Sequence, residues 1–361
     1  MHHIGWGWLI ALLFVLPVRA WAQQEEEITP ARQVENEVDV KKIVFDHIGD
    51  AYEWHITTWG GTPVTLPLPV MLYSPRSGWH CFSSARLEEG GSHEGFYIAP
   101  EGSPHAGKIV ERDAQGAEVR PWDFSLTKNA LSLLLNSLLL MAFVLGTARW
   151  YRRHPQGSDA PGGLVGFMEM LVMMIQDDII RPCVGSNYRR FSPYLLTAFF
   201  FIFVNNLMGL LPLFPGGANV TGNIAVTLVL ACCTFLAVNL FGTRHYWKEV
   251  FWPDVPWWLK FPVPMMPLIE FFGVLTKPFA LMIRLFANML AGHMAMLVLF
   301  SLIFISASMW PLLNGSLTVA SVLFSVFMNA LELLVAFIQA YVFTMLSAVF
   351  IGLAQERGVE E

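Results

Sequence analysis

Very few charged residues interrupt the long apolar stretches near the C-terminal end of the chain. Between residues 271 and 355, only Lys277, Arg284 and Glu332 carry a formal charge. Lys277 stands near the start of this region, but Arg284 lies about two helical turns further in, among apolar residues. An arginine at the centre of a membrane helix costs about 2.5–3.5 kcal/mol on insertion scales, and it cannot lose its proton. Arg284 therefore indicates a functional site whose partner is an acid, a water-filled channel or another subunit.

Groups that suit proton transfer lie in the same region. The surroundings of His293 and Glu332 can shift the pKa values of these side chains towards neutral pH. Gln339, Tyr341 and Asn223 can form hydrogen bonds. A single histidine in a membrane helix is more often a packed residue than part of a relay. A histidine, a glutamate and a glutamine together favour a path for protons.

Helical spacing predicts which of these side chains share a face. His293 is nine residues from Arg284, so the two side chains leave a straight helix on opposite sides, whereas Asn288 shares the face of Arg284. Glu332 and Gln339 are seven residues apart and share a face of the last helix. We expect His293 to pack against these two residues, while Arg284 faces elsewhere and lacks an acid in its own chain. The alternative is a structural ion pair between Arg284 and Glu332 that only joins two helices.

The composition predicts the elements that must position these residues. Of 361 residues, 55% are hydrophobic and only 14% are charged, and the mean hydropathy is +0.50. Soluble domains carry roughly 25% charged residues, so this chain needs lipid around it. The net charge is −6, and no basic patch suggests nucleic acid as a partner. We predict an all-α polytopic membrane protein with about five membrane helices, at about 129–150, 193–214, 222–243, 264–307 and 317–354.

The membrane domain is expected to cover residues 126–356. An amphipathic helix at about 164–181 contains acidic residues and is expected on the cytoplasmic face. The last two helices exceed the roughly 20 residues of a perpendicular span, so they are expected to tilt strongly. Lys and Arg residues concentrate in alternate loops, which predicts an outer N-terminus and a cytoplasmic C-terminal tail at 357–361.

The N-terminal third has a different character. Residues 1–22 form a predicted signal peptide with an apolar core and the small-residue pattern Ala20-Trp21-Ala22; a retained signal anchor is the alternative. Residues 23–125 are polar and rich in glycine and proline, and they predict a small β-rich or irregular extracytoplasmic region. Alternating residues at 52–56 and 64–66 predict short strands. The four cysteines are interpreted as small buried residues rather than as a disulfide or metal site.

Two other classes of membrane protein fit the sequence less well than a proton channel does. A secondary transporter with an arginine-anchored anion site usually has internal repeats, and we find none in the sequence. An intramembrane enzyme needs a nucleophile with a base, or a metal motif such as two histidines around a glutamate, and neither is present. We therefore expect no bound metal and no cofactor.

The motif around Arg284 resembles the signature of ATP synthase subunit a. It comprises Leu275-Thr276-Lys277-Pro278 and the run from Arg284 through Leu285-Phe286-Ala287-Asn288 to Ala291-Gly292-His293. Segments 193–212, 221–228 and 332–343 are also similar to that family. The resemblance covers roughly residues 125–356 and implies the stationary, non-catalytic channel subunit of a rotary enzyme in a bacterial inner membrane.

The resemblance also implies roles for individual residues. Arg284 would face a rotating c-ring of small subunits, each with one buried carboxylate that releases its proton there. His293, Glu332, Gln339 and Asn223 would line an outer half-channel. An inner half-channel would run past Asn288 and Glu270. The implied partners are the c-ring, b-type peripheral stalk subunits, other ATP synthase subunits, membrane lipid and protons, without nucleic acid.

The sequence departs from the family pattern at two positions. Well-known members have an acid at the position of His293 and a histidine at the position of Glu332, so the pair is exchanged here. If the two side chains touch, the exchange preserves their contact. Ala225 stands where many members have a further asparagine, which makes the lining of the outer channel thinner. Protons are the favoured coupled ion, although the choice between protons and sodium depends largely on the ring subunit.

Overall fold

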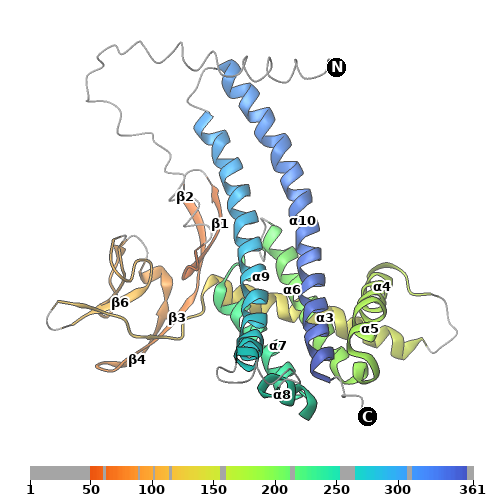
Figure 1. Ribbon diagram of the computed structural model, residues 1–361. Coiled ribbons are helices and arrows are strands. Elements are labelled where there is room, and N and C mark those ends of the chain that lie inside the picture. The colour runs from red at the N-terminus through yellow and green to blue at the C-terminus, as the bar shows by residue number, and fades with distance from the viewer. Residues whose placement is uncertain are drawn as a thin grey trace, which may run out of the picture. The chain divides into compact units, whose positions relative to one another are not determined.

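The computed structural model describes residues 49–59, 62–87, 90–100, 102–113, 116–154, 160–211, 216–252, 265–306 and 311–355. The predicted signal peptide, residues 23–48 and the predicted tail at 357–361 lie outside the described residues. The described chain is mostly helical, with small sheets in its N-terminal part (Figure 1). This confirms the predicted fold class.

Three small antiparallel sheets precede the helices. β1 (Glu53–Trp59) pairs with β2 (Thr62–Pro67), which confirms the two strands predicted from alternation. The second sheet has the order β4 (Gly78–Ser83), β3 (Pro69–Ser74) and β8 (Trp122–Asp123). The third has the order β5 (Phe96–Ile98), β6 (Ile109–Arg112) and β7 (Glu118–Val119). A single turn of 3-10 helix, η1 (Ser84–Arg86), follows β4.

Side chains of alternate residues build the core of this β region. Residues of β3 alternate between exposed and buried, so that Val70 and Leu72 are fully buried. They join a cluster with Phe82, Phe96 and Ile109. The region is therefore a packed unit with its own hydrophobic core.

The first membrane helix begins where the β region ends. α3 (Lys128–Arg153) is capped by Thr127, whose side chain accepts a hydrogen bond from the backbone N–H of Ala130. The backbone N–H of Asn129 donates to Asp50 Oδ1 at 3.1 Å. An acid beside the first turn of a helix satisfies a free backbone N–H and suits the helix dipole. These contacts connect the β region with the N-terminus of α3.

The next helical elements follow one another almost without a gap. They are α4 (Gly163–Ile175), the π-helical turn η3 (Gln176–Ile180), α5 (Arg181–Val184), the 3-10 turn η4 (Gly185–Asn187) and α6 (Tyr188–Leu210). The sequence predicted a separate amphipathic helix and a loop before 193. In the structure the helical backbone continues through that loop, and Gly185, with a φ of 71°, marks the change of direction.

A bent pair of helices comes after α6. α7 (Ile224–Leu240) is followed by α8 (Arg244–Phe251), and their axes differ by 103°. Thr243 caps α8 by accepting a hydrogen bond from the backbone N–H of Tyr246. The bend separates the apolar α7 from the polar α8.

Two long helices end the described chain. α9 (Met265–Ser306) and α10 (Pro311–Gln355) run side by side as an antiparallel pair (Figure 1). α10 also packs against α6 and α5. At Gly352 a Cβ atom would lie 1.9 Å from the carbonyl oxygen of Cys183, so only glycine permits this approach of α10 to α5.

Four described helical segments are long and apolar enough to cross a membrane: Lys128–Arg153, Gly163–Leu210, Met265–Leu299 and Gly315–Gln355. The bent pair of α7 and α8 makes a fifth if it counts as one span. This agrees with the predicted number of about five membrane helices. Residues from all helices between α4 and α10 form a shared core, in which Phe199, Leu285 and Phe343 are almost completely buried.

Candidate functional site

Arg284 lies on the outer side of α9. Its neighbours Leu281 and Leu285 are 2% and 0% exposed, whereas Arg284 itself is exposed. Among the ion pairs formed by the described residues, none includes Arg284. Helical spacing extends this exposed face along α9 through three small residues, Ala280, Ala287 and Ala291. Small side chains allow another helix to approach closely, so the charge is presented on a face suited to helix packing.

A hydrogen bond joins this face to the last helix. Asn288 Nδ2 donates to Gln339 Oε1 at 2.9 Å, and Gln339 is only 4% exposed. Asn288 is one turn from Arg284, about 6 Å along the axis. The sequence predicted that Gln339 would face the side of α9 opposite to Arg284. The structure differs, because the rotation of one helix about its axis relative to another is not fixed by spacing within either of them.

Glu332 lies against the backbone of α9 near His293. Glu332 is 8% exposed, and a Cβ atom at Gly292 would lie 2.6 Å from Glu332 Oε1. The missing side chain of Gly292 therefore makes room for the carboxylate. Gly292 is two turns from Arg284, about 12 Å along the axis. His293 follows Gly292 directly and is half-buried.

A second set of polar side chains connects α6 with α9 and α10. Asn206 Nδ2 donates to the carbonyl oxygen of Ala336 at 3.2 Å, and Thr221 Oγ1 donates to Asn206 Oδ1 at 2.7 Å. Asn219 Nδ2 donates to the carbonyl oxygen of Met289 at 3.2 Å. Sequence reasoning missed Asn206, Thr221 and Asn219 as site residues. The signal was present, since amides inside a chargeless apolar helix need buried partners.

Asn223 and Glu270 occupy other parts of the fold. Asn223 is the N-cap of α7, and its Oδ1 accepts a hydrogen bond from the backbone N–H of Ala225 at 3.0 Å. Glu270 lies in the first part of α9, close enough for its charge to act on the Tyr246 hydroxyl of α8. It is about 21 Å from Arg284 along the axis. Neither of these two interactions involves Arg284.

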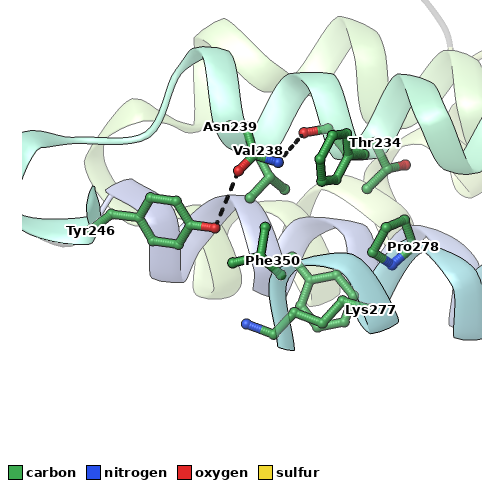
Figure 2. Close-up of a pocket in the computed structure, with 9 residues that line it drawn as sticks. Thr234, Val238, Asn239, Tyr246, Lys277, Pro278 and Phe350 are labelled. Carbon is green, nitrogen blue, oxygen red and sulfur yellow. Dashed lines mark hydrogen bonds between the residues drawn. The ribbon is translucent and has the colours of Figure 1, made fainter. Parts of the chain in front are cut away.

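A small cavity lies between Arg284 and Glu270 along α9. Its volume is about 10 Å³, close to the minimum that one water molecule needs. It is lined by residues of α7, α8, α9 and α10, as Figure 2 shows: Thr234, Phe235, Val238, Asn239, Tyr246, Val274, Lys277, Pro278 and Phe350. Tyr246 Oη donates to Asn239 Oδ1 at 3.5 Å, and Lys277 Nζ lies 5.6 Å from the centre of the Phe350 ring. The cavity combines polar and apolar walls.

A buried hydroxyl cluster borders this cavity. The hydroxyl groups of Tyr194 and Thr234 are 2.8 Å apart, and those of Thr234 and Ser347 are 3.3 Å apart. These three residues come from α6, α7 and α10. They tie three helices together by hydrogen bonds, and they were not identified as a group from the sequence.

The prediction that the four cysteines are buried is wrong for at least three of them. All four are free; Cys81, Cys232 and Cys233 are exposed, and Cys183 is partly buried. In a membrane protein, small apolar side chains can also face lipid, which sequence alone does not separate from burial. No group of three or more metal-ligating side chains occurs within the described ranges.

Comparison with known proteins decides the family. The family model of the ATP synthase A chain matches residues 133–352. The chain belongs to this family. ATP synthase subunit a of Chloroherpeton thalassium is 39% identical over 269 residues, which are 73% of each chain. ATP synthase subunit a 2 of Prosthecochloris aestuarii is 36% identical over 313 residues, 81% of this chain and 90% of the relative.

Family membership and the apolar helices together make the chain an integral membrane protein. A second model, of a domain of unknown function, matches residues 43–124. That match covers the β region and ends just before α3. The ATP synthase A chain model begins within α3, so the two matches divide the chain where the fold changes from strands to helices.

Proposed function

We propose that this chain is the proton-translocating subunit a of a rotary ATP synthase. In this role it is not itself catalytic. It presents Arg284 to the buried carboxylates of a rotating c-ring and forms two aqueous half-channels that open to opposite sides of the membrane. Family membership supports the general assignment, and the position of Arg284 supports the mechanism.

The exposed, permanently charged Arg284 carries the proposal. A guanidinium on an outward face of a membrane helix is costly unless a partner of opposite charge meets it. The alanines along the same face leave room for a helix of that partner. A fixed positive charge favours the ionised form of an arriving carboxylate, which therefore releases its proton. The same charge hinders protons from passing directly between the half-channels.

Glu332 and the amides near it support an outer half-channel. Glu332 and Gln339 line one side of α10, and Asn206 bonds to the carbonyl of Ala336 between them. His293, next to Gly292, lies at the level of Glu332. Protons would enter at this level and continue past Gln339 and Asn288 towards the ring. Asn223 would contribute at the start of α7.

The small cavity of Figure 2 supports an inner half-channel. It lies on the other side of Arg284 along α9, in the direction of Glu270. Asn239, Tyr246 and Lys277 give it polar walls. A proton released near Arg284 would leave past this cavity towards Glu270 and the cytoplasm. Asn288, which bonds to Gln339 on the Glu332 side of Arg284, would serve the entry path and not the inner half-channel to which the resemblance assigned it. This direction requires an outer N-terminus and a cytoplasmic C-terminus in a bacterial inner membrane, as the distribution of Lys and Arg favours.

Cross-linking in the assembled complex tests the proposed partner. The native cysteines are first replaced by serine, because Cys232 and Cys233 are exposed. Ala287→Cys on the face of Arg284 is expected to form a disulfide with cysteines placed on the outer helix of a small ring subunit. Leu138→Cys on α3, which is 64% exposed, is the control. Equal cross-linking of both variants, or none with Ala287→Cys, would contradict a ring on this face.

Gly292→Ala is expected to slow proton flow through the membrane sector. The new methyl group would overlap with the Glu332 carboxylate, which must then shift. Displacing a reacting group by about 1 Å can cost up to about a hundredfold in rate, so we expect a loss of at least about fivefold. The measurement is passive proton flow in vesicles after removal of the catalytic sector.

The same helix offers a matched control for this variant. Around Gly273 nothing lies within 4 Å of a Cβ atom, so Gly273→Ala is expected to leave the flow unchanged. Adding Glu332→Asp to Gly292→Ala shortens the acid and is expected to restore part of the flow. If the Gly292→Ala variant conducts protons as fast as the original protein, Glu332 is not part of the proton path.

A further inference from the structure

The second sheet of the β region has an exposed face that is rich in aromatic side chains, here called the aromatic face. Residues of β3 alternate between exposed and buried, and residues directly opposite in β4 and β8 point to the same side as their partners. The exposed side chains on this face are those of Met71, Tyr73, Trp79, Cys81, Trp122 and Phe124. Trp79 and Trp122 are 68% and 66% exposed. None of the residues of β3, β4 and β8 that point to this face is charged.

The aromatic rings form a contiguous surface. The ring centres of Tyr73 and Trp79 are 5.2 Å apart, and those of Trp79 and Phe124 are 5.6 Å apart. The opposite face of the sheet packs into the core of the β region through Val70 and Leu72. An antiparallel sheet with one face in a core commonly presents polar side chains on its other face. A contiguous apolar surface in that place indicates a binding surface.

Only a few residues separate the aromatic face from the membrane helix α3. Residues 129–148 contain no charged residue, and as a helix they are about 30 Å long, which matches the hydrocarbon thickness of a bilayer. Lys128 therefore lies where the hydrocarbon ends. Phe124 precedes Lys128 by four residues, so it lies within about 14 Å of Lys128 even if the chain between them is fully extended.

Backbone hydrogen bonds hold this connecting segment against β3. The N–H of Phe124 donates to the carbonyl oxygen of Met71 at 2.9 Å. The N–H of Leu126 donates to the carbonyl oxygen of Pro69 at 3.1 Å. Strand-like pairing therefore continues to within two residues of Lys128, the first residue of α3. Because of this pairing, the aromatic face stays close to the membrane surface.

The side chains of the aromatic face suit the boundary between lipid headgroups and hydrocarbon. Trp and Tyr combine an apolar ring with one polar group, and they are enriched at membrane–water interfaces. Arg120, two residues before Trp122, is exposed, and a guanidinium suits the phosphate of a headgroup. A protein partner could use the same aromatic residues. The short connection to α3 favours lipid, because lipid is present at this level around the helix.

We propose that the aromatic face inserts into the headgroup layer of the leaflet at which α3 begins. Phospholipid covers the face, with the rings at the boundary of the acyl chains and Arg120 towards the phosphates. The β region is then attached to the membrane twice, by the chain that enters α3 and by the aromatic face. This inference concerns residues before the match to the ATP synthase A chain, and it does not depend on the role of Arg284.

The collision rates of a spin label in the assembled complex test this proposal. Cys81 is exposed on the aromatic face and carries the label after Cys183, Cys232 and Cys233 have been replaced by serine. The complex is reconstituted into vesicles of phosphatidylcholine and phosphatidylglycerol. The control carries the label on Ala106→Cys, an exposed loop position between β5 and β6, with Cys81 also replaced by serine.

The label on Cys81 is expected to collide with oxygen more often than with a nickel chelate. Oxygen concentrates in hydrocarbon, whereas the chelate stays in water. We expect the oxygen-to-chelate ratio to be at least about threefold higher at Cys81 than at Ala106→Cys, because an inserted face lies about 5–10 Å deep. Equal ratios would show that the face lies in water and would overturn the proposal. A Cys81 label that meets neither reagent would overturn it too, because protein would then cover the face.

Photo-cross-linking identifies what touches the aromatic face. A benzophenone attached to Cys81 is irradiated in the same vesicles, and the products are analysed by mass spectrometry. The expected product carries the mass of one phospholipid. A product that joins Cys81 to another subunit, or to another peptide of this chain, would reject lipid as the occupant.

Removing two rings supplies a matched comparison. Trp79 and Trp122 are exposed, so the double variant Trp79→Ser with Trp122→Ser leaves the core of the β region intact. In this variant the ratio at Cys81 is expected to fall to the level of the Ala106→Cys control. Val119→Ser removes an apolar side chain of the third sheet that is 39% exposed, and it is expected to leave the ratio unchanged. An unchanged ratio in the double variant, or the same fall in both, would contradict insertion of the aromatic face.

Discussion

Replacing Arg284 with alanine is expected to abolish proton-driven ATP synthesis while the chain still inserts into the membrane. Arg284 is exposed on α9 and makes no ion pair within the described ranges, so its removal leaves no unpaired acid in the helix packing. Removing a charge from a membrane helix also lowers the cost of insertion. The loss should therefore appear in function and not in the amount of protein.

In the proposed mechanism, the size of the effect follows from the lost attraction between the Arg284 guanidinium and a carboxylate of the ring. Two unit charges 4 Å apart attract each other by about 4 kcal/mol at an effective dielectric constant of 20. Losing even part of this attraction predicts a fall of about a hundredfold or more in synthesis rate. The measurement is ATP synthesis by inverted membrane vesicles under an imposed proton gradient.

Lys277→Ala is the matched control on the same helix. Lys277 is partly buried and lies over the Phe350 ring, and its long side chain can reach towards the membrane surface. Lys277 also lines the exit cavity of Figure 2, so we expect this variant to lose some of the synthesis rate, but far less than Arg284→Ala loses. Normal synthesis by Arg284→Ala would reject the proposed mechanism, whereas equal losses in both variants would indicate that any cation in α9 matters.

Glu332→Gln is expected to slow proton entry far more than Lys277→Gln does. Glutamine has the same shape and fills the same space beside Gly292, but it cannot take up and release a proton. Positioned acid–base groups accelerate proton transfer by about 100-fold to 10,000-fold, so we expect a fall of about a hundredfold. Passive proton flow through vesicles without the catalytic sector measures this step directly.

Exchanging His293 and Glu332 provides an internal control for this prediction. The exchange variant His293→Glu with Glu332→His recreates the arrangement that the resemblance indicates for well-known members of the family. If the two side chains act as a pair, the exchange should restore flow that each single change removes, because effects of coupled residues are not additive. Equal effects of Glu332→Gln and Lys277→Gln would contradict the proposed outer lining.

Sequence patterns were sufficient for the elements that carry the site. Long chargeless runs predicted the helices around Arg284 and Glu332, and the observed helices include both runs. Alternation at 52–56 and 64–66 predicted short strands, and the structure has strands at Glu53–Trp59 and Thr62–Pro67. These features depend on neighbours within a few residues, which is the range over which periodicity carries information.

Contacts between helices that are distant in the sequence could not be predicted from periodicity. The bond between Asn288 and Gln339 joins residues 51 positions apart, and the bond between Asn206 and the Ala336 carbonyl spans 130 positions. Such contacts depend on how each helix is rotated and shifted against the next one. Spacing inside one helix does not determine this rotation, so Gln339 was expected on the wrong side of α9.

The contact at Gly352 has a mechanical consequence. The end of α10 is held there against Cys183, and nearby the Ala354 carbonyl accepts a hydrogen bond from the backbone N–H of Thr243. The opposite half of α10 is largely uncovered, with Val319 and Leu323 about 70% exposed. The pair of helices α9 and α10 is thus held by contacts at the C-terminal end of α10, whereas its other end is largely exposed. In the proposed rotary function, a ring that moves past Arg284 would push sideways on this helix pair, and the contact at Gly352 would pass the load to α5.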